Sequence, residues 1–486
     1  MKSVYVLTLL LPILFAALLL SKVGKGKWRV LTCFGVGVEM LLTILVAASA
    51  KTEVTMFTLL GLPFVLNPDV TGCIFAVLFG VLFFASGVFA TEYLDHDHNP
   101  GEFGAIYVLT LDAMIGLSWA GNLQTYYMFF ECLTLASFPL VLHELNMKSR
   151  KAAEKYLCYS LLGASFVLFG MIYIQKLLGT LTFAAGGYAV AEGDTKLALV
   201  IAFVTIMGFG CKAGIMPLHD WLPTAHPVAP APASAILSGT VTKAGVLGIM
   251  RVAYFLFGAE FLRGTWVQTT LVVIALITVF CGSMLAYKTR ILKKRLAYST
   301  VSQVSYALFG LFLFTEAGFV GAMLQVLFHA VCKVCLFLCS GSVIHHTGQE
   351  RIYSEQGQFN YYGLGKAMPW TMVGYTLASL SLVGLPPFGG FVGKEYLAEG
   401  SFVALGHAGW IGAAVLLTSA LLTAGYLLSI SSNAFFPKPG SLTVKAHEAT
   451  WRMTVPIMIL ACLLAILGIY SFGYSDMIFG LAEMLV

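Results

Sequence analysis

The sequence predicts an all-α polytopic membrane protein, because its composition and hydropathy and the placement of its charges all point to this class. Of the 486 residues, 59% are hydrophobic and only 10% are Asp, Glu, Lys or Arg, whereas a soluble domain carries about 25% charged residues. A long chain so poor in charge would expose apolar surface to water, and a bilayer removes that problem. The composition therefore excludes an array of soluble domains and indicates a lipid bilayer, not nucleic acid, as the main partner.

Hydropathy predicts fourteen spans. Crossing a hydrocarbon core of about 30 Å takes about 20 apolar residues, and continuous apolar runs without alternation favour helices over a barrel wall. The first run lacks a small-residue cleavage site and is followed by lysines, which favours a retained helix over a signal peptide. The spans are expected at 3–21, 30–50, 71–91, 103–120, 124–143, 152–176, 197–222, 230–256, 266–287, 296–315, 318–344, 367–398, 409–436 and 453–475.

Basic residues gather in alternate connections between these spans. Because basic loops stay in the cytoplasm, this pattern places both termini on the non-cytoplasmic side. Eighteen of the 28 Lys and Arg fall in one set, which is Lys22, Lys25, Lys27, Arg29, Lys148, Arg150, Lys151, Lys155, Lys288, Arg290, Lys293, Lys294, Arg295, Arg351, Lys366, Lys438, Lys445 and Arg452. The opposite set has six, which are Lys2, Lys51, Lys176, Lys196, Arg251 and Arg263.

The remaining four lysines, Lys212, Lys243, Lys333 and Lys394, lie inside predicted spans. A charge at the bilayer centre costs at least about 2.5–3.5 kcal/mol on insertion scales, so such residues usually face water or a partner group. The alternative is snorkelling, in which a lysine near a helix end reaches the headgroups. Lys243 follows Pro232 by about 16 Å of helix, and Lys333 lies halfway through its span, so snorkelling fits these two poorly.

Other polar residues also fall inside spans. Glu131 lies about two turns into the fifth span, where a lysine on a neighbouring helix is a natural counter-charge. Asp112 and Glu39 either serve a function or only cap helices and hydrogen-bond between them. His329 precedes Lys333 by four residues, which places both on one helix face. A histidine beside a buried lysine in a membrane favours a proton path over a simple hydrogen bond.

A proline interrupts the seventh span beside a lysine. Pro217 has no N–H to give to the carbonyl of Ala213, and its ring clashes there. We therefore expect the helix to break or kink next to Lys212. Irregular backbone at membrane depth is tolerated only inside protein or beside water.

The twelfth span is interrupted in the same way. Pro386 and Pro387 free the carbonyls of Leu382 and Val383, and Lys394 follows within about two turns. Two broken helices five spans apart are typical of an internally repeated transporter whose half-helices meet at the midplane. Prolines and glycines also serve simple kinking and close packing, but that alternative does not explain a lysine at each break.

The cysteines carry no clear ligand pattern. Cys332 and Cys335 form a CxxC, with Cys339 one turn further on, but no second pair is near and the surroundings are apolar. This favours packed thiols over metal ligands. We find no ligand set for a redox centre or a metal, and expect no cofactor in this chain.

Five stretches resemble the antiporter-like membrane subunits shared by respiratory complex I, membrane-bound energy-converting hydrogenases and Mrp-type sodium/proton antiporters. They lie within residues 100–430 and read "FFECLTLASFPLV", "KAGIMPLHDWLPTAHPVAPAPASAILSGTVTKAGVLGIMR", "KKRLAYSTVSQVSY", "FHAVCKVCLFLCSG" and "GLPPFGGFVGK". The resemblance implies three N-terminal helices in 1–100 and a five-helix repeat in 101–260 (helices 4–8). A second, inverted repeat in 261–437 (helices 9–13) and a last helix in 438–486 follow, with one discontinuous helix in each repeat.

The resemblance also implies which residues move protons. Glu131 matches the family's helix-five glutamate, which pairs with the lysine of broken helix seven, here Lys212. Lys243 matches the central lysine of helix eight, and His329 and Lys333 match a polar link on helix eleven. In the resulting hypothesis, burial disfavours the charged form of Lys212 and the glutamate favours it, so movement of Glu131 switches the lysine's affinity for a proton.

The terminal proton site stays open. Lys394 matches the charged residue of broken helix twelve, which is lysine in some relatives and glutamate in others, and Glu395 follows it directly. Asp112 is a further candidate. In the expected path a proton passes from the first broken helix by way of water and the central lysine to this end.

The resemblance implies a subunit that pumps protons or sodium ions in a redox-driven complex of an inner prokaryotic membrane. Its partners would be other membrane subunits, including further antiporter-like ones, and electron transfer would belong to them. One alternative is a Mrp-type antiporter without a redox arm. An independent solute carrier would need a midplane pocket, which an axial line of lysines does not resemble. A non-conducting structural subunit would tolerate replacement of all four lysines by leucine.

Overall fold

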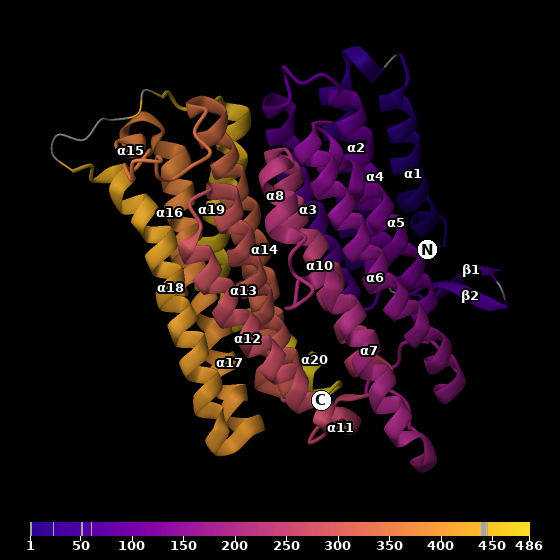
Figure 1. Cartoon of the computed structure of the whole chain (residues 1–486). Coiled ribbons are helices and arrows are strands. Elements are labelled where there is room, and N and C mark those ends of the chain that lie inside the picture. Colours follow the sequence, from indigo (N-terminus) through magenta and orange to yellow (C-terminus); the bar gives the residue numbers. More distant parts are fainter. Residues whose placement is uncertain (1, 23, 50–51, 60, 439–443, 445) are drawn as a thin grey trace.

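The computed structural model describes residues 2–22, 24–49, 52–59, 61–438, 444 and 446–486, and these residues are mostly helical (Figure 1). Lys51 and Lys445, which the orientation argument used, lie outside the described residues. The α-helices are α1 (Lys2–Leu20), α2 (Trp28–Ala48), α3 (Val70–Tyr93), α4 (Pro100–Ser118), α5 (Leu123–Leu142), α6 (Met147–Leu178), α7 (Thr195–Ala213), α8 (Leu222–Val228), α9 (Ala231–Ile236), α10 (Thr242–Phe255), α11 (Ala259–Leu262), α12 (Trp266–Lys288), α13 (Leu292–Leu313), α14 (Glu316–Thr347), α15 (Leu364–Ala367), α16 (Pro369–Val383), α17 (Gly389–Leu405), α18 (Gly409–Phe435), α19 (Trp451–Ile469) and α20 (Ser471–Glu483). Shorter elements are the 3-10 turns η1 (Gly24–Gly26), η2 (Glu192–Asp194) and η4 (Gly406–Ala408), the π-helical turn η3 (Leu237–Val241), and strands β1 (Val54–Leu59) and β2 (Leu62–Leu66).

Thirteen helical stretches of the described residues are long and apolar enough to cross a membrane, which confirms the predicted all-α membrane architecture. This is one stretch fewer than the fourteen predicted spans, and the difference lies at the predicted span 367–398. A break after Val383 leaves α16 with 15 residues, and α17 continues through η4 and α18 as one 47-residue stretch. The difference therefore arises from an interrupted helix and not from a missing one.

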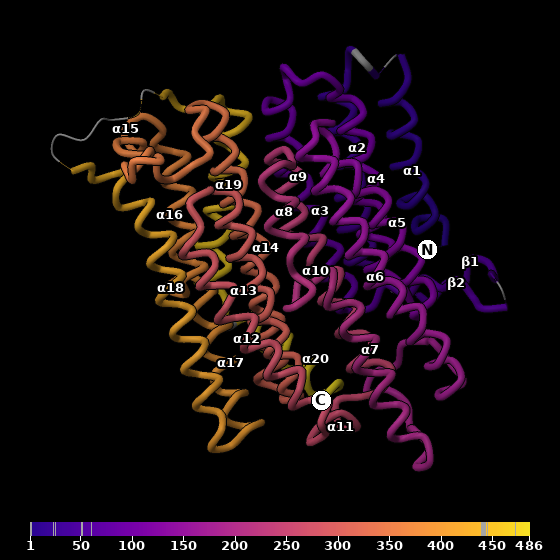
Figure 2. Tube along the Cα trace, in the orientation of Figure 1, coloured from indigo at the N-terminus to yellow at the C-terminus, as the bar shows by residue number. Residues whose placement is uncertain are grey.

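The helices run side by side in one bundle (Figure 2). The first six helices lie at one end of the view and α16, α18 and α19 at the other (Figure 1). α14 is 32 residues long and lies between them, where it packs against α3, α9, α13, α16, α17 and α19. A single long helix therefore touches elements from both halves of the chain.

Both chain ends lie at the same side of the bundle. In Figure 1 α1 begins at its lower end and the C-terminus lies near the base, whereas α15 lies at the upper end. The basic connections that precede α2, α6 and α13 lie at that upper end as well. Which side faces the cytoplasm stays a prediction from the basic residues.

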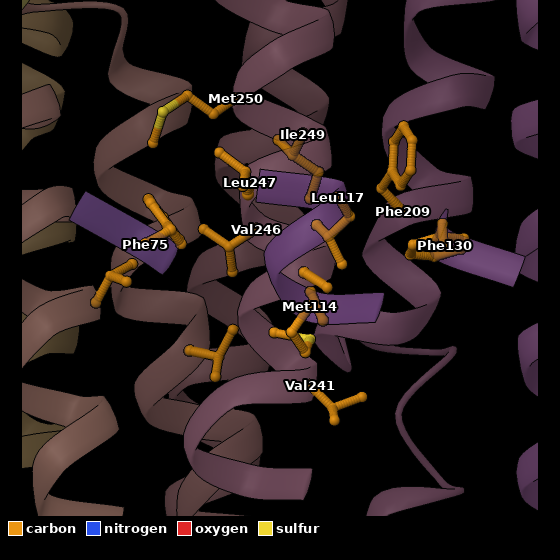
Figure 3. Packing of buried hydrophobic residues seen from close by; sticks show 14 of the residues in the cluster. Phe75, Met114, Leu117, Phe130, Phe209, Val241, Val246, Leu247, Ile249 and Met250 are labelled. Atoms are coloured by element: carbon orange, nitrogen blue, oxygen red, sulfur yellow. The ribbon is translucent and has the colours of Figure 1, made fainter. Parts of the chain in front are cut away.

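The core of the N-terminal half is closely packed and apolar. Figure 3 shows side chains of α3, α4, α5, α7 and α10 converging on one cluster, including Phe75, Met114, Phe130, Phe209 and Leu247. The stretch from 231 to 255, which contains α10, is buried along its whole length. A polar group on α10 therefore faces protein on every side, which excludes snorkelling for Lys243.

The predicted break beside Lys212 is present. α7 ends at Ala213, and Gly214 follows with a left-handed φ of +87°. The N–H groups of Gly214 and Ile215 both donate to the carbonyl of Gly210, which closes the helix end. A glycine cap of this kind is commonly followed by a proline, so Pro217 prevents the helix from resuming directly.

The predicted break before Lys394 repeats this geometry. α16 ends at Val383, and Gly384 has a φ of +86°. The N–H groups of Gly384 and Leu385 donate to the carbonyl of Leu380, and Pro387 stands three residues after the glycine, as Pro217 does after Gly214. Both interruptions are confirmed, and each is a glycine-capped helix end backed by a proline.

A β-hairpin lies between α2 and α3, and hydropathy did not predict it. β1 and β2 pair antiparallel and project from the bundle (Figure 1). Asn122, which caps α5 through its side-chain oxygen, also donates to the carbonyl of Pro63 in β2. The hairpin is therefore tied to the start of α5.

Arg251 was assigned to a non-cytoplasmic connection, and the structure corrects this. It lies in α10 with 1% of its surface exposed. Its guanidinium donates to both carboxylate oxygens of Asp69, at 2.6 and 2.7 Å, and lies over the rings of Phe183 and Phe255. The planar, bidentate hydrogen bonds to Asp69 explain how a buried cation is tolerated here. The pair joins the start of α3 to the end of α10.

We expect Arg251→Ala to destabilise the protein by about 3 kcal/mol, because Asp69 loses its guanidinium in a partly buried site. Thermal unfolding in detergent measures the effect. Arg351→Ala is the matched control, since its pair with Glu355 is exposed and such pairs contribute about 0–1 kcal/mol. Equal effects of the two substitutions would contradict a structural role for the Arg251 pair.

Candidate functional site: buried lysines across the bundle

Lys243 and His329 form a direct contact between α10 and α14. The Lys243 Nζ atom lies 2.7 Å from His329 Nδ1, and neither residue is more than 1% exposed. The backbone of η3 can approach α14 closely here because Gly239, in η3, has no side chain. A Cβ there would stand 2.4 Å from a methyl carbon of Val334 on α14. A charged lysine only donates, so His329 Nδ1 accepts when Lys243 carries the proton.

The π-helical turn η3 precedes Lys243 and supplies its other partner. Lys243 Nζ donates to the carbonyl of Ser238, five residues earlier, at 2.7 Å. π-turns inside α-helices occur frequently at functional sites. On the far side of the contact, His329 Nε2 is buried and has no hydrogen-bond partner among the described residues. The imidazole therefore has one nitrogen on the lysine and one free for a water or a proton.

Lys333 stands one turn after His329 on α14 and reaches α13. Its Nζ donates to the Ser299 hydroxyl at 2.7 Å and lies 3.2 Å from the carbonyl of Leu296. The Tyr426 hydroxyl of α18 donates to the same Ser299 oxygen at 2.7 Å. Tyr426 also lines a cavity of about 320 Å³ near the start of α13. Two hydroxyl groups thus join Lys333 to a cavity with polar walls.

Lys394 closes the end of α16. Its Nζ donates to the carbonyls of Leu382 and Val383, at 2.7 and 2.6 Å, and these are the carbonyls that the prolines were predicted to free. The ammonium also lies 5.3 Å from the centre of the Tyr306 ring. Glu395 is exposed on α17. Lys394, and not Glu395, therefore faces the break.

Lys212 faces α5 and α6. Its Nζ donates to the Thr134 hydroxyl at 2.7 Å and lies 3.4 Å from the Tyr156 hydroxyl, over the ring of Phe130. Glu131 stands one turn before Thr134, and its Oε1 is buried without a hydrogen bond to the described part of the chain. The Glu131 carboxylate and the Lys212 ammonium interact electrostatically, but their oxygen and nitrogen atoms do not come within 4.0 Å of each other. Thr134 takes the place of the direct ion pair that the resemblance implies.

Lys243 contacts His329 directly, whereas Lys212 is related to Lys243 only by the packing of α7 against α10. Lys212 and Lys243 lie beside a close approach of α7 and α10, where a Cβ on Gly245 would stand 2.5 Å from the backbone nitrogen of Ala213. His329 lies within electrostatic reach of Lys243, Lys333 and Lys394. The structure therefore brings Lys243, Lys333 and Lys394 together around His329, and places Lys212 with Glu131 beside α5 and α6.

Two basic residues of this centre were not predicted from the sequence. His226, on α8, is fully buried, and neither ring nitrogen has a hydrogen-bond partner in the described ranges. Lys243, Lys293 and Lys333 all lie within its electrostatic reach. Lys293 was assigned to a cytoplasmic loop, but it is 7% exposed and donates to the carbonyl of Ala229. A histidine in an apolar, proline-rich stretch is the signal that could have revealed His226.

The carboxyl groups of Glu39 and Asp112 form a pair of buried acidic groups. Glu39, on α2, is 1% exposed, and both of its carboxylate oxygens lack hydrogen bonds to described residues, as does Oδ1 of Asp112 on α4. The two side chains interact with each other electrostatically, and both Asp112 and Glu131 act on Cys132. The Glu39 carboxylate therefore does not serve as an interhelical hydrogen-bonding group within the described chain. Asp112 extends the acidic end of the row toward α2.

A helical membrane bundle with two interrupted helices and a set of buried basic residues is the architecture of an antiporter-like membrane subunit. Residues 120–423 match the family described as NADH:quinone oxidoreductase/Mrp antiporter, TM, and the chain belongs to this family. It is 33% identical to NADH-quinone oxidoreductase subunit N of Desulforudis audaxviator over 85% of this chain and 82% of that one. It is 27% identical to a Na(+)/H(+) antiporter subunit of Alkalihalophilus pseudofirmus over 98% and 96%. A chain of the Mrp complex from Dietzia sp. DQ12-45-1b shares the fold, with a TM-score of 0.86, 21% identity and coverage of 100% and 98%.

We expect Lys394→Met to lower stability by about 2 kcal/mol or more, because two carbonyls at the end of α16 lose their donor and each buried unmet acceptor costs about 1–3 kcal/mol. Thermal unfolding can be followed with a fluorogenic thiol reagent, since Cys332, Cys335 and Cys339 are buried and free. Lys196→Met, at an exposed position of α7, is the control. An unchanged midpoint in Lys394→Met would show that the ammonium does not cap this break.

Proposed function

We propose that this chain is the proton- or sodium-translocating membrane subunit of a multi-subunit complex. Ions would move along a row of buried residues, which we call the row and which consists of Glu131, Lys212, Lys243, His329, Lys333 and Lys394. The observation that carries this proposal is the 2.7 Å contact between Lys243 Nζ and His329 Nδ1. It joins α10 to α14 in a core that admits no lipid. A proton can cross such a contact without a large movement of either helix.

The entry step depends on Glu131. Its carboxylate favours the charged form of Lys212 by attraction through a low-dielectric medium. Because Thr134 and Tyr156 already bind the ammonium, a small rotation of the Glu131 side chain can change the attraction while the lysine stays in place. Movement of one carboxylate would then load or unload the proton on Lys212.

Repulsion between like charges drives the later steps. Among the described residues, no carboxylate oxygen lies within 4.0 Å of the Lys243 or Lys333 ammonium. A positive charge on one of these groups therefore raises the cost of a charge on the next. Protonation at one end can in this way force release at the other, and the hydroxyls of Ser299 and Tyr426 offer Lys333 a route to the polar cavity.

The two interrupted helices support the expected inverted repeats in 101–260 and 261–437. Gly214 and Gly384 cap α7 and α16 with the same left-handed conformation and the same pattern of carbonyl contacts. Each break carries a lysine. We further propose that both termini face away from the cytoplasm of a prokaryotic cell, because the basic connections lie at the opposite end.

The complex is proposed to be redox-driven, of the complex I or energy-converting hydrogenase type, and the 33% identity to a quinone oxidoreductase subunit supports this. A Mrp-type antiporter is the alternative, supported by the near-complete coverage of a Na(+)/H(+) antiporter subunit. Cofactors would lie on other subunits in the first case. Purification of the native complex decides between them, since redox subunits or small antiporter subunits would copurify.

Lys243→Ala is expected to reduce coupled ion movement at least tenfold while the complex still assembles, because the contact with His329 is lost. Ion-dependent fluorescence quenching in membrane vesicles measures the rate, and Lys196→Ala is the matched control. Normal pumping by Lys243→Ala would remove the central relay from the mechanism. Full activity after replacement of all four lysines by leucine would favour a structural subunit instead.

Glu131→Gln is expected to slow ion movement at least tenfold and to change its dependence on pH, because the amide keeps the shape but removes the charge that acts on Lys212. The rate is measured over a pH series in the same vesicles. Glu154→Gln, at an exposed position of α6, controls for general loss of acidic charge. A pH profile that matches the wild type would argue against the Glu131–Lys212 switch.

A further inference from the structure

Asp97, His98 and His143 converge at the end of the bundle that carries the basic connections. Asp97 and His98 lie in the connection between α3 and α4, and His143 caps the C-terminal end of α5. His98 Nδ1 lies 2.7 Å from Asp97 Oδ1, and His143 Nε2 lies 3.1 Å from Asp97 Oδ2. One ligand atom from each of the three residues can be chosen so that all lie within 4.8 Å of one another.

The His143 ring is held firmly. The residue is buried, and its ring packs edge-on against Phe103, with centroids 5.2 Å apart. The ring of His98 lies 5.2 Å away on another side. Although His143 Nε2 is close to the Asp97 carboxylate, it makes no hydrogen bond to the described residues. A buried ring nitrogen therefore faces one oxygen of the Asp97 carboxylate, and His98 Nδ1 contacts the other oxygen.

We propose that Asp97, His98 and His143 bind one Zn²⁺ ion. Two imidazole nitrogens and a carboxylate oxygen are ligands that Zn²⁺ takes in proteins, at about 2.0–2.2 Å, with the fourth position left to water. Ligand atoms around one such ion stand roughly 3.3 Å apart by the tetrahedral geometry, and the three atoms here lie within 4.8 Å of one another, so small side-chain rotations would bring them to that spacing. A bound ion would also give His143 Nε2, which makes no hydrogen bond to the described residues, a ligand bond.

Neighbouring charged groups are engaged elsewhere. Asp95, two residues before Asp97, forms an ion pair with Arg29 of α2. His96, in the same loop, lies within electrostatic reach of His345 of α14. The three ligands therefore come from a short loop and one helix end, and the site needs no movement of α2 or α14 to form.

Zinc at this position would join α5 to the α3–α4 connection. α5 also carries Glu131, about 18 Å along the helix from His143 at 1.5 Å per residue, and Thr134, which binds Lys212. If the proposed function holds, a bound ion limits movement of α5 and slows transport. Zn²⁺ would then act as an inhibitor from the basic end of the bundle.

Binding is tested with the full-length protein in detergent by titration with Zn²⁺ alone and by absorption spectra of bound Co²⁺. One equivalent is expected, with the affinity at least tenfold weaker in Asp97→Asn and in His143→Ala. His96→Ala, in the same loop, is the matched control and should bind as the wild type does. Absence of stoichiometric binding, or an equal loss in His96→Ala, would overturn the site. Thermal unfolding without metal verifies that each variant is folded.

Inhibition is tested separately in vesicles. Micromolar Zn²⁺ should slow ion movement by the wild type and by His96→Ala, but not by His143→Ala. Zinc binding without any transport in the wild type would leave the metal site standing and contradict the proposed function. Equal inhibition of all three proteins would contradict regulation through this site, even if the ion binds there.

Discussion

Burial of ammonium groups is the constraint on which the rest of this structure depends. Lys243 and Lys333 lie where neither lipid nor bulk water can solvate them, so each must be matched by polar atoms from neighbouring helices. For Lys333 they are a hydroxyl and a carbonyl of α13, whereas Lys243 and Lys394 are bound by backbone that departs from regular helix. The π-turn η3 presents the Ser238 carbonyl to Lys243, and the capped end of α16 presents two carbonyls to Lys394. At Lys243 and Lys394, irregular backbone and a buried charge therefore occur together.

The same constraint explains the central place of α14. His329 and Lys333 lie one turn apart on it, and each binds a different neighbour, α10 for the histidine and α13 for the lysine. A helix that served only as packing would not need two buried basic groups at this spacing. Because α14 also touches α3, α16, α17 and α19, a change of charge at His329 is felt by both halves of the bundle.

Much of this arrangement could be predicted from the sequence, because its signals are local. Apolar runs give the spans, prolines give the breaks, and a lysine deep in a span is conspicuous by itself. The contacts could not be predicted, since they join residues far apart in the chain. The hydroxyl of Thr134, and not the carboxylate of Glu131, binds Lys212, and the sequence does not show which of these two α5 residues the lysine reaches. Arg251 and Lys293 were assigned to loops because the ends of α10 and α13 are ambiguous in hydropathy.

α5 links these findings into one physical argument. Its start is tied to the β-hairpin through Asn122, its middle carries Glu131 and Thr134 against Lys212, and its end carries His143. Interactions on a helix this long act together, because sliding or rotating one end displaces the other in a close-packed bundle. The position of Glu131 relative to Lys212 therefore depends on how both ends of α5 are fixed. Under the proposed function, elements far from the lysines would in this way control when the first proton is taken up.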